Sequence, residues 1–361
     1  MRHFVLLCVL IAVSARAHSA EEPAIDRGDI RGGQKAVLLK DHKPNFPANQ
    51  INLGGEGWTV LYYNIDEQGQ PVDIVPAEFA GPRKFVDTAL ESLQHWRYKP
   101  ATSVGVPVPQ FGNQVLYRFM HSNAERTIGK KRLELSKTIQ NHTAAGQLDV
   151  AREALDQAFA SNLNVYEIAM FNVLRADLAR AQKNFTEEIL YLQRARRAGD
   201  MLSNQANRAI LARIFIAAAR AQDVDTGIET FGQLEKTKSQ IKEWAKYEDV
   251  YKQLVALRDS QRPLAIQGVI LDDGIGSVGT WIKELRRHAF EFDKPKGNFA
   301  KFELRCDQKF FTAKVDEGRS WQVPPTWGDC MLLVFGDVGA TFRLVELPSQ
   351  SLVAPAAVET P

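Results

Sequence analysis

The sequence predicts an α+β protein of several domains: a small α/β domain, then an all-α region of helical hairpins, then a small all-β sandwich or barrel. Three observations predict this order. Residues 58–119 alternate strand, turn and helix patterns, residues 123–258 have helical patterns and contain no proline, and short strands follow Pro263. The 361 residues are enough for two or three domains, each with its own core.

The N-terminus has the three-part pattern of a secretory signal peptide. A basic start precedes the ten-residue apolar run Phe4–Val13, and small residues up to Ala20 fit a cleavage pattern. The run is too short to span a bilayer as a helix, and the alternative is a buried N-terminal helix. We expect residues 1–20 to be cleaved and the mature chain to be periplasmic, beginning with a loosely ordered leader at residues 21–43.

The charge balance argues against a nucleic-acid partner. Cleavage after Ala20 removes Arg2 and Arg16, which lowers the 45 Lys and Arg residues to the same number as the 43 Asp and Glu residues. A neutral chain exerts no long-range attraction on nucleic acid or on an anionic membrane. The sequence also lacks catalytic motifs, a phosphate-binding loop and histidines at metal-ligand spacing, so we predict no catalytic residue, cofactor, metal or small-molecule substrate.

The first domain begins with two strands. Trp58–Ile65 is dense in β-branched and aromatic residues. Val72–Phe79 is a second strand, across a hairpin loop in which Gly69 can adopt a positive φ. Pro76 cannot donate a backbone hydrogen bond, so it places the second strand at an edge or at an irregularity.

A helix and a third strand complete this domain. Pro82 stands near the start of the helix, and Pro100 ends the element. The apolar face of the helix consists of residues at helical spacing: Phe85, Val86, Ala89, Leu90, Leu93 and Trp96. After a loop marked by Gly105 and Pro107, the third strand is predicted at Gln114–Phe119.

A short run in this region resembles a known family. The run is Trp96-Arg97-Tyr98-Lys99-Pro100-Ala101, preceded by Pro44-x-Phe46-Pro47 and followed by Gly105-x-Pro107-Val108. With the order of strands and helix, residues 44–122 resemble the C-terminal domain of the TonB family of envelope energy transducers. The motif residues are Trp96, Arg97, Tyr98, Pro100 and Ala101. We expect a packed helix end, with Arg97 held by stacking or by a carboxylate.

The resemblance implies a binding module. In that family the exposed edge strand pairs with an extended segment of a partner, so that backbone groups provide the affinity. The corresponding strand here is the expected partner-binding edge, and its residues are Gln114, Val115, Leu116, Tyr117 and Arg118. The implied partners are envelope proteins, either outer-membrane receptors or a second copy of the chain.

Residues 123–262 carry a repeated pattern. Gly146-Gln147-Leu148, Lys183-Asn184-Phe185 and Gln222-Asp223-Val224 each open a run of small and apolar residues at helical spacing, with offsets of 37 and 39 residues. This pattern is typical of stacked helical hairpins. It resembles a degenerate tetratricopeptide-like array, and an ordinary helical bundle is the alternative.

Residues 263–348 form the predicted β-domain. Turn signals separate short strands at 264–271, 301–305, 309–313, 331–335 and 341–347. Cys306 and Cys330 lie here, and in an oxidising compartment they predict one disulfide. The alternative is a two-cysteine metal site, which lacks nearby histidines. We expect the Ala/Pro-rich tail at residues 349–361 to be disordered.

Together these features indicate an exported, non-enzymatic scaffold protein of the periplasm that docks envelope partners by strand pairing. The alternative is an energy transducer of the TonB family that acts in transport across the outer membrane. The sequence departs from such a transducer because the apolar run is short, no Pro-rich spacer precedes the TonB-like part, and that part comes first. An enzyme with a cleft between the later domains is the least favoured hypothesis.

Overall fold

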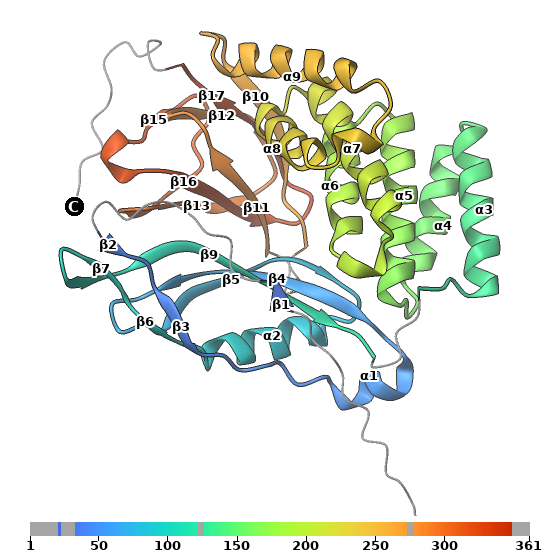
Figure 1. Cartoon of the computed structure of the whole chain (residues 1–361), viewed down its shortest axis with the longest axis horizontal. Coiled ribbons are helices and arrows are strands. Elements are labelled where there is room, and N and C mark those ends of the chain that lie inside the picture. The colour runs from blue at the N-terminus through green and yellow to red at the C-terminus, as the bar shows by residue number, and fades with distance from the viewer. Residues whose placement is uncertain (1–20, 23–32, 122–125, 273, 275–277, 349–361) are drawn as a thin grey trace, which may run out of the picture.

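A computed structural model describes residues 21–22, 33–121, 126–272, 274 and 278–348. The predicted signal peptide and C-terminal tail therefore lie outside the described residues. Three bodies follow one another along the chain: a sheet with a helix, an array of helices, and a pair of sheets (Figure 1). The predicted order of mixed, helical and β regions is confirmed.

The first domain is an antiparallel sheet with a helix packed against it. The sheet has the order β1-β9-β4-β5. Its strands are β1 (Glu21–Glu22), β4 (Gly57–Ile65), β5 (Pro71–Ala80) and β9 (Gln110–Phe119). Helix α2 (Lys84–Gln94) packs its buried side on the sheet, and a short helix α1 (Ala48–Leu53) precedes β4. Pro76 lies in the edge strand β5, as predicted.

Gly69 occupies the hairpin turn with φ 78°, as predicted. A Cβ at this position would lie 1.9 Å from the carbonyl oxygen of Tyr98, so only glycine fits. The carbonyl oxygen of Gly69 accepts a hydrogen bond from the Tyr98 backbone N–H at 2.8 Å. The hairpin turn is therefore fixed against the motif segment that follows α2.

Five short strands extend the first domain: two lie in the lead-in chain, which comprises residues 33–47, and three follow α2. The strands are β2 (Gly33–Gln34), β3 (Val37–Lys40), β6 (Arg97–Lys99), β7 (Ala101–Ser103) and β8 (Val106–Val108). β3 pairs with β6, β2 pairs with β7, and β7 forms a hairpin with β8.

These strands correct two expectations. The described part of the leader is not loosely ordered, because its backbone groups pair with the motif strands β6 and β7. The stretch around Gly105 is a hairpin rather than a loop, because Val104 and Gly105 both adopt positive φ and close a two-residue turn.

The middle region is a run of helices in which each helix packs on the next. The helices are α3 (Lys130–Ala144), α4 (Leu148–Phe159), α5 (Val165–Ala181), α6 (Phe185–Arg196), α7 (Asn204–Ala221), α8 (Val224–Glu235) and α9 (Trp244–Arg258), with 3-10 turns η1 (Gly199–Met201) and η2 (Lys238–Gln240). The three aligned sequence motifs open α4, α6 and α8. The helical region is therefore confirmed, and its tetratricopeptide-like label stays a prediction.

The last region is a sandwich of two antiparallel sheets with a shared core, of order β10-β17-β12-β15 and β11-β16-β13-β14. The strands are β10 (Leu264–Val269), β11 (Val278–Leu285), β12 (Ala289–Lys296), β13 (Phe299–Cys306), β14 (Phe310–Ala313), β15 (Ser320–Gln322), β16 (Cys330–Asp337) and β17 (Thr341–Glu346), with a 3-10 turn η3 (Pro325–Trp327). Cys306 ends β13 and Cys330 begins β16. The two residues are register partners, and they form the predicted disulfide.

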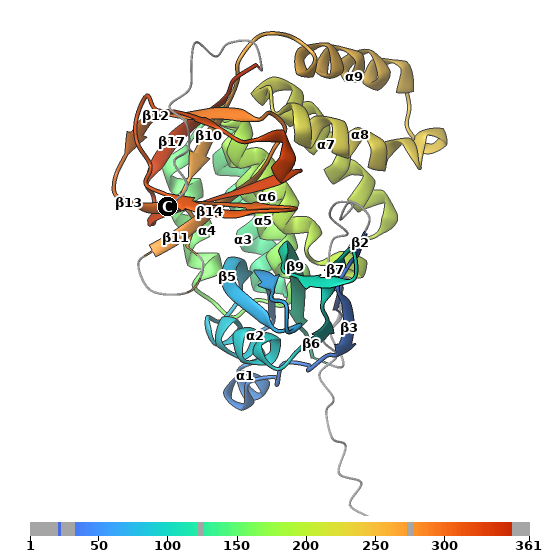
Figure 2. The same cartoon turned by 90° about the vertical axis from the view of Figure 1, so that its left-hand side faces the viewer.

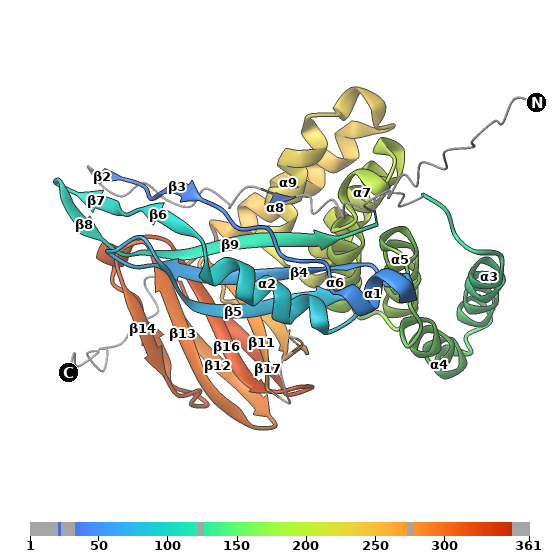
Figure 3. The same ribbon diagram turned by 90° about the horizontal axis from the view of Figure 1, so that it is seen from below.

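The sheet of the first domain is the middle layer of the molecule. Helix α2 covers one face, and the helices and the β-sandwich lie on the other side (Figures 2 and 3). Trp58, Val60 and Leu116 from this sheet share a core with α3, α4 and α5. Toward the sandwich, Phe111 of β9 stacks on Phe310 of β14 with ring centroids 6.1 Å apart. The first domain is thus packed against both of its successors.

Candidate functional site

Strand β9 carries the predicted docking residues, and most of their side chains are buried. Val115 and Tyr117 belong to the core beneath α2, and Leu116 belongs to the core shared with the helices. Arg118 is buried, and its Nε donates a hydrogen bond of 2.7 Å to the carbonyl oxygen of Arg197 in the helical region. Of the five predicted residues only Gln114 is partly exposed. A partner could therefore reach this strand through its backbone, but not through the four buried side chains.

β9 is not a free edge along its whole length. In β1, Glu21 lies opposite Tyr117 and Glu22 lies opposite Leu116. The prediction that residues 114–118 form one open edge is therefore corrected. Two glutamates carry no strand signal of their own, so the sequence pattern could not reveal this pairing. Among the described strands, none pairs with the outer side of β9 between residues 110 and 115.

Two aromatic motif residues pack against the face of the sheet that α2 covers. Trp96 is buried, and its Nε1 donates a hydrogen bond of 3.0 Å to the carbonyl oxygen of His42 in the lead-in chain. The hydroxyl oxygen of Tyr98 lies 2.6 Å from that of Tyr63 in β4. The motif therefore ties the lead-in chain, the end of α2 and the sheet together, as a packed helix end was expected to do.

The other three motif residues, Arg97, Pro100 and Ala101, lie at and after the end of α2. Arg97 is exposed, and its Nη1 donates hydrogen bonds to the carbonyl oxygens of Gln94 at 2.9 Å and Trp96 at 2.6 Å. The prediction of a carboxylate or an aromatic partner for Arg97 is wrong, because its guanidinium instead donates to a carbonyl at the end of α2 and to one just after it, where helical acceptors lack backbone donors. Pro100 separates β6 from β7, and Ala101 is fully buried at the start of β7.

Sequence reasoning missed the role of Glu56, which anchors the first domain to the helices. Its buried carboxylate accepts hydrogen bonds from the backbone N–H groups of His121 and Val165, both at 2.9 Å. Val165 opens α5, so the carboxylate lies at the positive end of a helix dipole. The glycine-rich stretch around Glu56 thus connects the first domain to the helical region.

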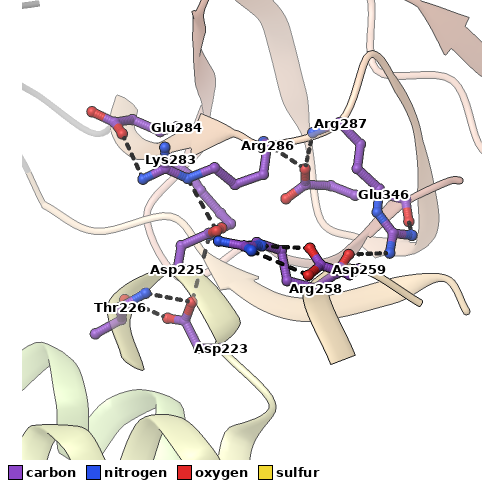
Figure 4. Close-up of polar contacts among 10 residues, drawn as sticks. All are labelled: Asp223, Asp225, Thr226, Arg258, Asp259, Lys283, Glu284, Arg286, Arg287 and Glu346. Carbon is purple, nitrogen blue, oxygen red and sulfur yellow. Dashed lines mark hydrogen bonds and ion pairs between the residues drawn. The ribbon is translucent and has the colours of Figure 1, made fainter. Parts of the chain in front are cut away.

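A second polar site lies where the β-sandwich meets the helical region (Figure 4). The Nζ of Lys283 lies 2.8 Å from Oδ2 of Asp225 and 3.5 Å from Oδ1 of Asp223. The Nε of Arg286 donates to Oδ1 of Asp225 at 3.0 Å. We call these residues, with Glu346, the interdomain ion cluster.

The electrostatics of this cluster favour a structural role. Burial disfavours the charged form of Lys283, yet the carboxylates of Asp223 and Asp225 outweigh burial and raise the pKa of Lys283 above its ordinary value. Burial raises the pKa of Glu346, whose carboxylate accepts a backbone hydrogen bond from Arg286 at 2.8 Å. A lysine held charged at neutral pH is neither a general base nor a nucleophile. The cluster is therefore suited to holding two domains together.

Two kinds of site are absent from the part of the chain that the structure describes. No three His, Cys, Asp or Glu side chains there group in a way that could hold a metal ion. No helix in the same residues is long and apolar enough to cross a bilayer.

The comparison with known proteins concerns the first domain. Residues 42–120 match the family model of the Gram-negative bacterial TonB protein C-terminal domain. The match covers the end of the lead-in chain, the hairpin, α2, the motif strands and β9, which are the elements that carry the sequence resemblance. We refer to this region as the TonB-like domain.

The relatives of the TonB-like domain are TonB proteins by name. The TonB protein of Yersinia enterocolitica is 28% identical over 90 residues, which is 25% of this chain and 34% of the relative, so the chain spans about a third of that protein. The solved TonB C-terminal domain of Pseudomonas aeruginosa is 22% identical, with 25% of this chain and 91% of that chain covered and a TM-score of 0.23. The TonB2 protein of Vibrio anguillarum is 30% identical, with coverages of 27% and 93% and a TM-score of 0.20.

Sequence reasoning also missed an exposed apolar strand. In β3, the side chains of Val37, Leu38 and Leu39 are 55%, 39% and 68% exposed. The signal was present as an apolar run between Lys35 and Lys40, but it lay in a segment read as a leader. This strand is a further candidate for binding.

Proposed function

We propose that the TonB-like domain binds an extended segment of an envelope protein by strand pairing at β9, and that the chain takes part in TonB-linked transport across the outer membrane. The match of residues 42–120 to the TonB C-terminal model carries this proposal. The outer side of β9 at residues 110–115 supports it, because the described strands leave those backbone groups unpaired by any ladder. The partner is an outer-membrane receptor or another envelope protein, and binding involves no catalytic step.

A periplasmic scaffold is the second candidate function. Packing of the TonB-like domain favours it, because Glu56 and Arg118 bond to the helical region and Trp58 lies in a shared core. A domain held in this way presents its edge in a fixed orientation to the helices and the sandwich. In the scaffold role, β9 binds one envelope protein and the tetratricopeptide-like helices bind another protein.

The scaffold role places the mature chain in the periplasm, after cleavage of the signal at Ala20, whereas a transducer anchored in the inner membrane keeps its N-terminus uncleaved. Mass spectrometry of the mature protein tests this placement. A mature N-terminus at or near Glu21 supports export and cleavage. Retention of Phe4–Val13 would favour an anchored transducer over the soluble scaffold.

The docking proposal is tested by crosslinking in intact cells. A photoreactive residue replaces Gln114 in β9, and the trapped protein is identified by mass spectrometry. The matched control is Gln267, an exposed glutamine in strand β10 of the sandwich. We expect a defined envelope protein to be trapped from Gln114 only. Equal trapping from both positions, or none from Gln114, contradicts docking at β9.

A further inference from the structure

Strand β3 precedes the TonB-like domain in the sequence, pairs with its strand β6, and forms an exposed apolar rim there. All four residues of β3 are exposed, and Leu39, the most exposed of its three apolar residues, lies where the ladder with β6 shifts register. Figure 3 shows β2 and β3 along the outside of the domain, beyond β6 and β7. Large apolar side chains gathered on one exposed strand mark a binding surface rather than the scattered exposure of ordinary surfaces.

The backbone of β3 is available on its outer side. β3 pairs with β6 on one side, and in the described residues no strand pairs with the other. An edge strand with unpaired N–H and C=O groups is a template for a further strand. The outer side of β3 can therefore accept an extended chain by backbone hydrogen bonding.

The charge around this rim is positive. Lys40, Lys43 and Lys99 are exposed, and Arg97 stands opposite Lys40 in the ladder. Asp41 is the single carboxylate in residues 33–43. A partner strand with acidic side chains would therefore be attracted and oriented, whereas a basic one would be repelled.

We infer that β3 is a second docking edge, which takes an extended protein segment with alternating apolar and acidic side chains. The apolar side chains contact the apolar residues of β3 that lie on their own face of the extended sheet, because successive side chains of a strand point to opposite faces, and the acidic ones meet the lysines. This edge is separate from β9, and the inference does not depend on docking there.

Two other occupants fit the rim less well. A lipid surface cannot pair the backbone groups of β3, and leaving them unpaired in an apolar layer is costly. A second copy of the chain would bring the same lysines toward this rim, and like charges disfavour that pairing. An acidic segment satisfies both the backbone and the charges.

The test uses the full mature chain and a fluorescent peptide of alternating valine and glutamate or aspartate, followed by fluorescence anisotropy. We expect saturable binding that weakens with salt. L39S should weaken binding several-fold, and the double variant K40E/K99E should weaken it by roughly tenfold or more. The matched control is K130E/K131E, two exposed lysines at the start of α3, which should bind as the unaltered chain does. Circular dichroism checks that each variant is folded.

Several outcomes would overturn the inference. Equal peptide binding by K40E/K99E and K130E/K131E would remove β3 as the site. Binding to vesicles containing phosphatidylglycerol, lost in L39S and without peptide binding, would identify a lipid surface instead. A dimer lost in L39S would identify a second copy. Crosslinking from Gln114 should persist in K40E/K99E, so failure here is distinguishable from failure of docking at β9.

Discussion

Val104 shows how one residue can carry strain at an exposed position. It is 88% exposed at the tip of the β7–β8 hairpin and adopts φ 51°, a conformation that β-branched residues rarely take. Asn-Gly is the favoured pair in such a two-residue turn. We expect V104N to raise the free energy of unfolding by about 1 kcal/mol, because asparagine tolerates this backbone conformation.

Urea unfolding of V104N measures this gain. V106N is the matched control, since Val106 is exposed in β8 but does not have positive φ. A gain in V106N equal to that in V104N would assign the effect to removal of an exposed apolar side chain. No gain in V104N would contradict the strain.

Glu303 and Arg305 in β13 form a buried ion pair that lies outside the core shared by the two sheets of the sandwich. The Nη2 of Arg305 lies 2.8 Å from Oε2 of Glu303, and the side chains are 0% and 5% exposed. E303A leaves the arginine buried without its partner, which should cost about 3–5 kcal/mol of unfolding free energy. K301A removes the half-exposed lysine that also meets Glu303, and should cost less than about 1 kcal/mol. Urea unfolding compares the two variants; similar costs would contradict the account.

At the level of elements, the disulfide crosslinks two neighbouring strands of the sandwich. Cys306 and Cys330 are 24 residues apart, and they enclose β14, β15 and η3. Loss of a crosslink over a loop of this length should lower the free energy of unfolding by about 3 kcal/mol, because the unfolded chain gains freedom.

Unfolding of the double variant C306A/C330A, with and without a reducing agent, tests the crosslink. We expect the reducing agent to lower the stability of the unaltered chain to that of the variant and to leave the variant unchanged. A variant as stable as the oxidised chain would show that the strands need no crosslink.

Elements with strong local patterns could be predicted from the sequence. The three helix-opening motifs give the starts of α4, α6 and α8, and Gly69 marks its turn. Strands β11 and β12 were not predicted, because charged residues such as Lys283 and Glu284 interrupt the apolar alternation. Lys283 forms an ion pair with Asp225 of helix α8, and Glu284 forms one with Arg286. A local sequence pattern does not contain such contacts.

The candidate site was harder to predict than the fold. The family motif located the domain correctly, but the exposure of β9 depends on chain segments far away in sequence. Leu116 and Arg118 are buried by the helices, and Tyr117 pairs with Glu21. Tertiary packing therefore decides which edge is open, and β3 is exposed where the sequence pattern predicted only a leader.

At the level of the whole molecule, Glu78 and Arg197 join the TonB-like domain to the helices. The Nε of Arg197 donates to Oε1 of Glu78 at 2.8 Å. Burial raises the pKa of Glu78, but the charges of Arg197 and Arg194 outweigh burial and hold the pKa below its ordinary value of 4.5. The stabilisation is thus fully present above about pH 4.5 and is lost as the pH falls through the lowered pKa.

The variant E78Q tests this pH dependence. At pH 7 we expect its free energy of unfolding to be lower by about 1–3 kcal/mol, because a charge-assisted hydrogen bond is weakened. Urea unfolding at a series of pH values should show the difference shrinking toward acid pH. A difference that is constant from pH 7 to pH 3 would contradict a role for the ionised carboxylate.

Strand pairing at β9 is the central claim, and hydrogen exchange with the partner trapped from Gln114 tests it most directly. The exchange of backbone amides in residues 110–115 is compared in the free chain and in the complex. We predict slower exchange in alternate amides of this segment, because a new strand would accept hydrogen bonds from them. Unchanged exchange at residues 110–115, with protection in the helices or the sandwich instead, would contradict docking at β9.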